Sequence, residues 1–164
     1  MEYILDGGRI AKTITSDGGD NVVIDTAYGK MLVNRHDTIR GHHLINTGKA
    51  DDHGDIELLK RIVTHIGKQS IVMDVGANFG THSLALAPLA YKVFAFEPQR
   101  PIYNILVGNV ALNSLYNVYC YQVPVGNSTT KIELPVFDYS KPMNFGGVEF
   151  SGNQKEFIGQ QRSE

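Results

Sequence analysis

A short apolar stretch that runs directly into a glycine-rich turn constrains the fold of this chain more than any other feature. Residues 71–75 read Ile-Val-Met-Asp-Val, as expected of a strand buried on both faces. Residues 76–80 read Gly-Ala-Asn-Phe-Gly, and residues 81–87 have the composition of a helix. A strand, such a turn and a helix open a Rossmann-like sheet, in which the turn holds a nucleotide. Gly76 and Gly80 allow a close approach of backbone and ligand, and Asn78 is the non-glycine residue that best tolerates a positive φ.

An acidic residue at the end of a second apolar stretch points the same way. Residues 91–96 are mainly apolar, and Glu97 follows them about 20 residues after Gly76. A carboxylate in that position accepts the hydroxyl groups of a ribose. Asp74 ends the first strand, where it would repel a phosphate but suit a cation. S-adenosylmethionine carries a ribose, a sulfonium and an ammonium group and no phosphate. The sequence therefore favours this cofactor, with Asp74 and Glu97 facing one crevice.

These residues also resemble a known family. The segment from Asp74 to Gly80, the Phe-Glu-Pro of residues 96–98, Leu112-Asn113 and the Gly126 turn are similar to the FkbM-type S-adenosylmethionine-dependent methyltransferases. The resemblance covers residues 28–150 and implies a class I methyltransferase fold, with methyl transfer to an oxygen acceptor. It implies a cofactor site made of Asp74, Gly76, Ala77, Asn78, Phe79, Gly80, Glu97, Pro98 and Gly126. It further implies that a lead-in segment around His36-Asp37 packs under the cofactor domain.

The sequence predicts three regions. Residues 1–54 form an N-terminal β hairpin and lead-in segment, in which residues 10–15 pair with residues 21–26. Residues 55–150 form an incomplete Rossmann-like domain, whose first helix runs from about residue 56 and is capped by Asp51 and Asp52. Residues 151–164 form a polar C-terminal tail. The histidines at positions 36, 42 and 43 match no zinc-binding pattern, so we expect no metal site.

The expected fold class is α/β, a Rossmann-like class I methyltransferase sheet truncated after its third core strand, with an N-terminal β extension. The resembled family continues with a further core strand and a Lys-x-Asp-x-Glu-Gly-type motif, which this sequence lacks. We expect the cofactor-binding half of a methyltransferase, and whether it is an active enzyme stays open. Residues 71–75 would be a central strand with one bare edge. We expect a homodimer that covers this edge, or a C-terminal segment that folds onto it.

Composition and charge exclude several other classes of protein. The net charge of −2 gives no electrostatic case for nucleic acid or a membrane surface as partner. The single cysteine cannot form an internal disulfide, and the N-terminus does not read as a signal peptide, so we expect a cytoplasmic protein. Two alternatives stay open: a non-catalytic cofactor-binding or assembly module, and an NAD-dependent oxidoreductase. The Gly-x-x-x-Gly spacing and Asp74 count against the second, and no catalytic base can be named.

Overall fold

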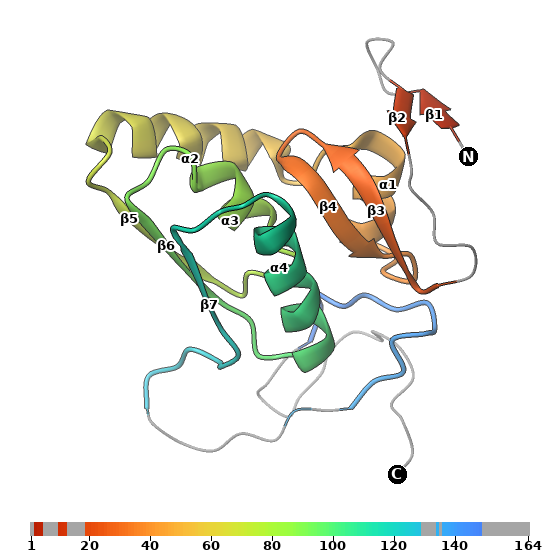
Figure 1. Ribbon diagram of the computed structural model, residues 1–164. Coiled ribbons are helices and arrows are strands. Elements are labelled where there is room, and N and C mark those ends of the chain that lie inside the picture. The colour runs from red at the N-terminus through yellow and green to blue at the C-terminus, as the bar shows by residue number, and fades with distance from the viewer. Residues whose placement is uncertain (1, 5–9, 13–18, 129–133, 135, 149–164) are drawn as a thin grey trace.

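The computed structural model describes residues 2–4, 10–12, 19–128, 134 and 136–148 (Figure 1). In chain order, the elements in this part are β1 (Glu2–Ile4), β2 (Ile10–Lys12), β3 (Asn21–Thr26), β4 (Gly29–Asn34), α1 (Arg40–Thr47), α2 (His53–Ile66), β5 (Ile71–Val75), α3 (Thr81–Leu86), β6 (Lys92–Phe96), α4 (Arg100–Leu112) and β7 (Val118–Tyr121). The strands form three sheets: β1 pairs with β2, β3 pairs with β4, and β5, β6 and β7 lie together in that order.

The three-stranded sheet is parallel throughout. Ile71 of β5 lies opposite Lys92 of β6, and Phe96 of β6 lies opposite Tyr121 of β7. Parallel neighbours need crossover connections, which α3 and α4 provide. Both helices lie on the same side of the sheet (Figure 1), and the β6 side chains Val93 and Ala95 are fully buried beneath them. This confirms the predicted α/β class, and the carboxyl ends of all three strands meet at one edge.

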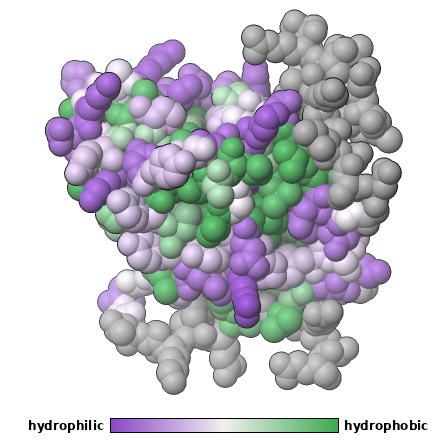
Figure 2. Space-filling model, in the orientation of Figure 1, coloured by the Kyte–Doolittle hydropathy of each residue, from purple (hydrophilic) through white to green (hydrophobic). Residues whose placement is uncertain are grey.

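The hairpin of β3 and β4 is held against α4 by two asparagines one helical turn apart. The amide of Asn109 accepts from the N–H of Leu32 and donates to the carbonyl of Leu32 at 2.9 Å. Asn113 does the same at Lys30, at 3.0 and 2.7 Å. Four helical residues rise about 6.0 Å and two strand residues about 6.8 Å, so the two amides match the strand spacing. The side chains of α4 thus bond to the edge of β4 where a third strand would otherwise pair. Figure 2 shows hydrophobic residues gathered along this junction.

A single hydrophobic core joins the hairpin to the Rossmann-like unit. Its fully buried members include Met31 and Val33 of β4, Leu44 of α1, Ile56 of α2 and Phe79 from the turn after β5. These side chains come from both the lead-in region and the segment that follows β5. Residues that precede the glycine-rich turn by 20 or more positions in the sequence therefore pack against Phe79 in the core and hold the turn in place.

The pairing of the first strands differs from the prediction. Residues 10–15 were expected to pair with residues 21–26, but β2 pairs with β1, and β3 pairs with β4. The connection from β3 to β4 is only Ala27-Tyr28, and Gly29 follows it with a φ of 113°. A shorter connection loses less conformational entropy on closing than the longer link from β2, which favours this hairpin.

Helix α1 was not predicted from the sequence. Asp37 precedes it, and its carboxylate oxygen Oδ1 accepts from the N–H groups of Ile39 and Arg40 at 3.0 and 3.1 Å. Gly48 ends the helix in the left-handed region, with a φ of 67°. An aspartate before a helix and a glycine after it are known start and stop signals. The predicted tail, residues 151–164, lies outside the described residues.

Candidate functional site

The turn after β5 has the backbone geometry that its composition predicts. Gly76, Asn78 and Gly80 have φ values of 77°, 50° and 88°, in the left-handed region. The N–H groups of Gly76 and Ala77 both donate to the carbonyl of Phe96 at the end of β6, at 2.9 and 3.0 Å. The turn therefore lies across the carboxyl ends of β5 and β6, where open α/β sheets bind ligands.

The two turn glycines serve different purposes. A Cβ atom on Gly80 would lie 2.6 Å from Cδ1 of Leu106 in α4, so this position is closed by packing. A Cβ atom on Gly76 would meet nothing within 4 Å, so this position faces open space. Gly80 allows α3 to approach α4 closely, whereas Gly76 leaves room on the ligand side of the turn.

Asp74 lies beside a pocket of about 260 Å³ at the end of β5. Its carboxylate oxygen Oδ2 accepts from the hydroxyl of Ser83 in α3 at 2.6 Å, which fixes the side chain. The same pocket is lined by Gly76, Ala77 and Asn78 from the turn and by Thr81 and His82 from α3. A carboxylate held in this way gives the pocket a fixed site for a cationic group.

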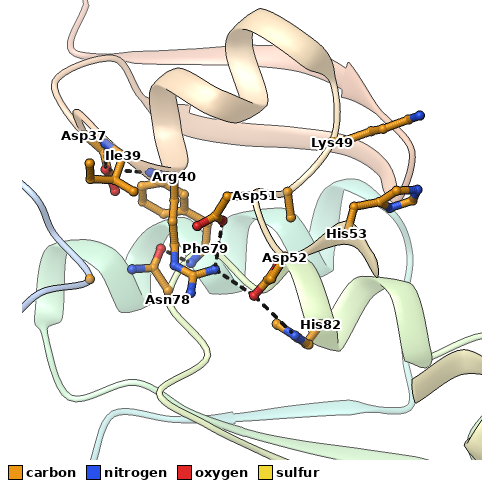
Figure 3. A network of polar contacts seen from close by, with 12 residues as sticks. Asp37, Ile39, Arg40, Lys49, Asp51, Asp52, His53, Asn78, Phe79 and His82 are labelled. Carbon is orange, nitrogen blue, oxygen red and sulfur yellow. Dashed lines mark hydrogen bonds and ion pairs between the residues drawn. The ribbon is translucent and has the colours of Figure 1, made fainter. Parts of the chain in front are cut away.

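Arg40 closes this pocket from the side of α1 (Figure 3). Its Nη1 atom donates to Asp51 at 3.4 Å and to Asp52 at 3.2 Å, and Nε2 of His82 lies 3.6 Å from Asp52. Asp52 is at the N-cap of α2 but makes no side-chain cap bond, so the predicted capping role of its side chain is wrong. The ion pairs of Arg40 and the contact of His82 with Asp52 join α1, the start of α2 and the start of α3 around the pocket.

Glu97 lies behind the turn and is almost fully buried, with 3% of its surface exposed. Its Oε2 atom accepts from the N–H of Asn78 at 3.0 Å, and its Oε1 atom accepts from the N–H of Gln99 at 2.9 Å. Burial raises the pKa of Glu97, and the charge of Asp74 raises it further. The two acids predicted at neighbouring strand ends are thus close enough for the charge of Asp74 to affect the ionisation of Glu97.

A second pocket, of about 340 Å³, is lined by the residues that directly follow Glu97 in the sequence. Its lining is mainly apolar and includes Pro98, Pro101, Val136 and Phe137. The carboxylate of Glu97 binds a residue of the first pocket, Asn78, and a residue of the second, Gln99. Glu97 therefore connects one residue of a small polar pocket with one residue of a larger apolar pocket.

The segment from residue 136 to residue 148 covers Glu97. The side-chain amide of Gln99 donates to the carbonyl of Phe145 at 2.9 Å, and the hydroxyl of Tyr139 donates to Gln99 at 2.9 Å. Burial raises the pKa of Tyr139 to about 12, and the nearby Glu97 contributes to this shift. Phe145 is fully buried. The carboxylate of Glu97 is thus buried near Tyr139 and lines neither of the two pockets.

The predicted site residues are distributed unevenly. Asp74, Gly76, Ala77 and Asn78 line the first pocket, and Pro98 lines the second. Phe79 points into the core and Gly80 packs against α4. Gly126 is exposed and lines neither of these two pockets. Arg40 was not predicted as a site residue. The available signal was Asp37, which precedes the helix that carries Arg40 and accepts a hydrogen bond from its N–H group.

Among the described residues, no group of three or more His, Cys, Asp or Glu side chains could hold a metal ion. None of the helices in this part of the chain is long and apolar enough to cross a membrane.

Comparisons with known proteins bear on the fold. No protein-family model and no curated protein matches the sequence. A solved S-adenosylmethionine-dependent methyltransferase from Agrobacterium tumefaciens matches with a TM-score of 0.50 and 16% identity, over 72% of this chain and 38% of that one. Trm5b from Pyrococcus abyssi matches with a TM-score of 0.49 and 17% identity, over 73% and 34%. A tRNA m1G37 methyltransferase from M. jannaschii matches with a TM-score of 0.48 and 17% identity, over 68% and 32%.

The chain spans only 32% to 38% of the length of these three structures. At this level of identity the likeness concerns the fold alone. The described part of the chain has the Rossmann-like α/β fold that is seen in an S-adenosylmethionine-dependent methyltransferase.

Proposed function

We propose that this chain binds S-adenosylmethionine and supplies the cofactor site of a methyltransferase. The observation that carries the proposal is the arrangement at the carboxyl edge of the sheet. A polar pocket beside Asp74 and an apolar pocket beside Pro98 are connected through Glu97, whose carboxylate bonds to one residue of each. S-adenosylmethionine has a charged end, a ribose and a flat aromatic base in the same order.

The first pocket suits the methionine end of the cofactor. Asp74 would accept from the ammonium group, because its carboxylate is already held in place by Ser83. Among the described residues, the ion pairs of Arg40 use Nη1, so Nε and Nη2 remain able to donate to the carboxylate of the ligand. The open space at Gly76 would admit the chain of the ligand past the turn.

The second pocket suits the adenine base. Two prolines and Phe137 give it an apolar lining of the kind that an aromatic ring prefers. The ribose would lie between the two pockets, where Glu97 could accept from its hydroxyl groups. Because Tyr139 and Phe145 are bonded to Gln99 beside this carboxylate, we infer that residues 139–148 shift when the cofactor binds, while Val136 and Phe137 keep their place at the second pocket.

The transfer would pass the methyl group from the cofactor sulfur to an acceptor oxygen. The carbon–sulfur bond breaks as the carbon–oxygen bond forms, and the acceptor loses its proton. The preference for oxygen rests on the resemblance to the FkbM-type enzymes. On this proposal the chain contributes to the rate mainly by holding the cofactor in position and excluding water.

Isothermal titration calorimetry with S-adenosylhomocysteine, S-adenosylmethionine and NAD tests the cofactor assignment. The first two ligands should bind and NAD should not. The Asp74→Asn variant should weaken binding of S-adenosylmethionine by ~10-fold or more, the usual loss for a hydrogen bond to a charged group. Asp55→Asn, on the exposed side of α2, is the matched control and should bind normally. Binding of NAD alone, or an equal effect of both variants, would contradict the assignment.

Hydrogen exchange of the amides in segment 139–148 tests the inferred movement. Amides of this segment should exchange at a different rate when S-adenosylhomocysteine is present, whereas amides of β3 should not. A methyl-transfer assay with candidate oxygen acceptors then separates an enzyme from a non-catalytic cofactor-binding module.

A further inference from the structure

One face of the parallel sheet carries large apolar side chains that no described element covers. The exposed fractions are 60% for Ile71, 65% for Met73 and 57% for Val75 on β5, and 41% for Tyr119 and 42% for Tyr121 on β7. Phe94 and Phe96 of β6 lie between them and are half-buried. We refer to these seven side chains as the open face. In Figure 1 the helices α3 and α4 lie on the opposite side of the sheet.

The open face is ordered into straight rows. The strand register places Met73, Phe94 and Tyr119 in one row across the sheet and Val75, Phe96 and Tyr121 in the next. The rings of Phe94 and Tyr119 stack with centroids 5.5 Å apart, and those of Phe96 and Tyr121 with centroids 5.3 Å apart. The face is therefore a flat, preformed surface.

A face of this kind is unusual for a parallel sheet. Parallel sheets are normally covered on both sides, because their strands are apolar on both faces. Here the covered side follows that rule, with Val93 and Ala95 fully buried, whereas the other side exposes side chains of the same chemical character. Contiguous apolar patches of this size mark interaction surfaces.

The charge on the open face does not select a partner of opposite charge. Among the residues of β5, β6 and β7 that alternate onto the open face, Lys92 is the one that carries a charge. Its ammonium group lies over the rings of Tyr91 and Tyr119, 5.2 and 5.5 Å from their centroids. No carboxylate lies in these rows, so the face complements an equally apolar surface, such as that of a second copy.

The area of the open face is sufficient for a dimer. Large side chains present roughly 150–250 Å² each, so seven of them, five exposed by about half, present roughly 600 Å². Two such faces packed together would bury roughly 1,200 Å², which is the lower limit for stable specific interfaces.

We propose that a second copy of this chain covers the open face, sheet against sheet, about a two-fold axis. A two-fold axis brings the same patch of both copies together, and the aromatic rows of each copy would pack between those of the other. The sequence predicted association through the outer edge of β5. The described residues leave that edge unpaired as well, but pairing of two edges would leave both apolar faces in water.

Sedimentation equilibrium of the full chain, over a concentration range from about 1 to 100 µM, tests the proposal. The wild-type chain should show twice the monomer mass of 18.1 kDa at the upper end of the range. Met73→Lys and Val75→Lys, in different rows, should each raise the dissociation constant of the dimer at least ~100-fold, because each dimer would bury two unpaired ammonium groups. The control is Tyr116→Lys, at a side chain that is 90% exposed outside the open face, and it should dimerise as the wild type does.

Circular dichroism of each variant checks that it is folded. If one of the two lysine variants fails to fold, the other, in a different row, still tests the proposal. A wild-type chain that remains a monomer over the whole range overturns the proposal. A dimer that tolerates both lysine substitutions overturns it too, because the interface would then lie elsewhere.

Discussion

The amide of Asn109 should be one of the most sensitive positions in the fold. It is fully buried in α4 and binds two segments at once. It pairs with the N–H and carbonyl of Leu32 in the hairpin and donates to the carbonyl of Phe79 in the glycine-rich turn at 2.8 Å. Leucine has the same branched shape as asparagine and is somewhat larger, but its side chain has no polar atoms. Asn109→Leu would therefore leave three backbone groups unpaired without opening a large cavity.

The size of the effect follows from the burial of these groups. The carbonyl of Phe79 is buried and the two groups of Leu32 are half-buried. An unpaired buried group costs about 1–3 kcal/mol, which gives about 3–5 kcal/mol for the three. Leucine has a better helix propensity than asparagine, which offsets ~0.5 kcal/mol. The free energy of unfolding should fall by roughly 3–4 kcal/mol, a large part of the 5–15 kcal/mol typical of a domain.

Urea unfolding followed by circular dichroism measures this change. Asn113→Leu is the matched control, because Asn113 makes the same pair of bonds to Lys30 at an exposed position, where water can replace them. The control should lose less than about 1 kcal/mol. If the two variants lose the same amount, or if Asn109→Leu loses less than about 1.5 kcal/mol, the reasoning about buried unpaired groups is refuted.

Three further predictions concern the turn, the cysteine and a buried acid. Gly80→Ala should lower the free energy of unfolding by about 2–4 kcal/mol, because the new Cβ would meet Leu106 and the φ of 88° disfavours alanine. Gly76→Ala should lower it by only about 1–2 kcal/mol, because its φ of 77° is unfavourable but its Cβ would meet nothing. Urea unfolding should rank the two variants in this order, and the reverse order would contradict the packing argument. Burial raises the pKa of the Cys120 thiol to about 11, so a thiol reagent at pH 8 should label the folded chain ~100-fold more slowly than the urea-unfolded chain, and equal rates would argue against burial. Burial also raises the pKa of Asp37 above 3.8, so the folded chain keeps this proton at pH values where the unfolded chain has lost it. The stability from this proton is fully present below pH 3.8 and is lost as the pH rises through the folded pKa. Asp37→Asn should therefore become more stable relative to the wild type between about pH 4 and pH 7. A difference in unfolding free energy between the two that does not change with pH would contradict this prediction.

The strand, turn and helix at residues 71–86 could be predicted because their signals are local. An apolar stretch sets the strand, and glycine and asparagine set the left-handed turn. The parallel sheet follows from the repetition of strand and helix along the chain. These features depend on residues close together in the sequence, so a single sequence contains them.

The parts that could not be predicted depend on choices between distant partners. Residues 21–26 could pair with a strand before or after them, and the outcome rests on the two-residue turn at Ala27-Tyr28. The contribution of Arg40 to the pocket depends on how α1 lies against the turn, which its composition does not reveal. The surroundings of Glu97 depend likewise on Tyr139 and Phe145, about 40–50 residues further on, which bond to the neighbouring Gln99.

The ion pairs of Arg40 have a consequence for how the chain can be divided. A polypeptide that starts at residue 55 would retain β5, the turn and all of the nucleotide-fold signals in the sequence. It would lose Arg40, which lines the pocket beside Asp74, and Asp52, with which Arg40 forms an ion pair. On the proposed assignment, the affinity for the ligand would depend partly on residues 40–52, which lie before the segment that carries the sequence motifs.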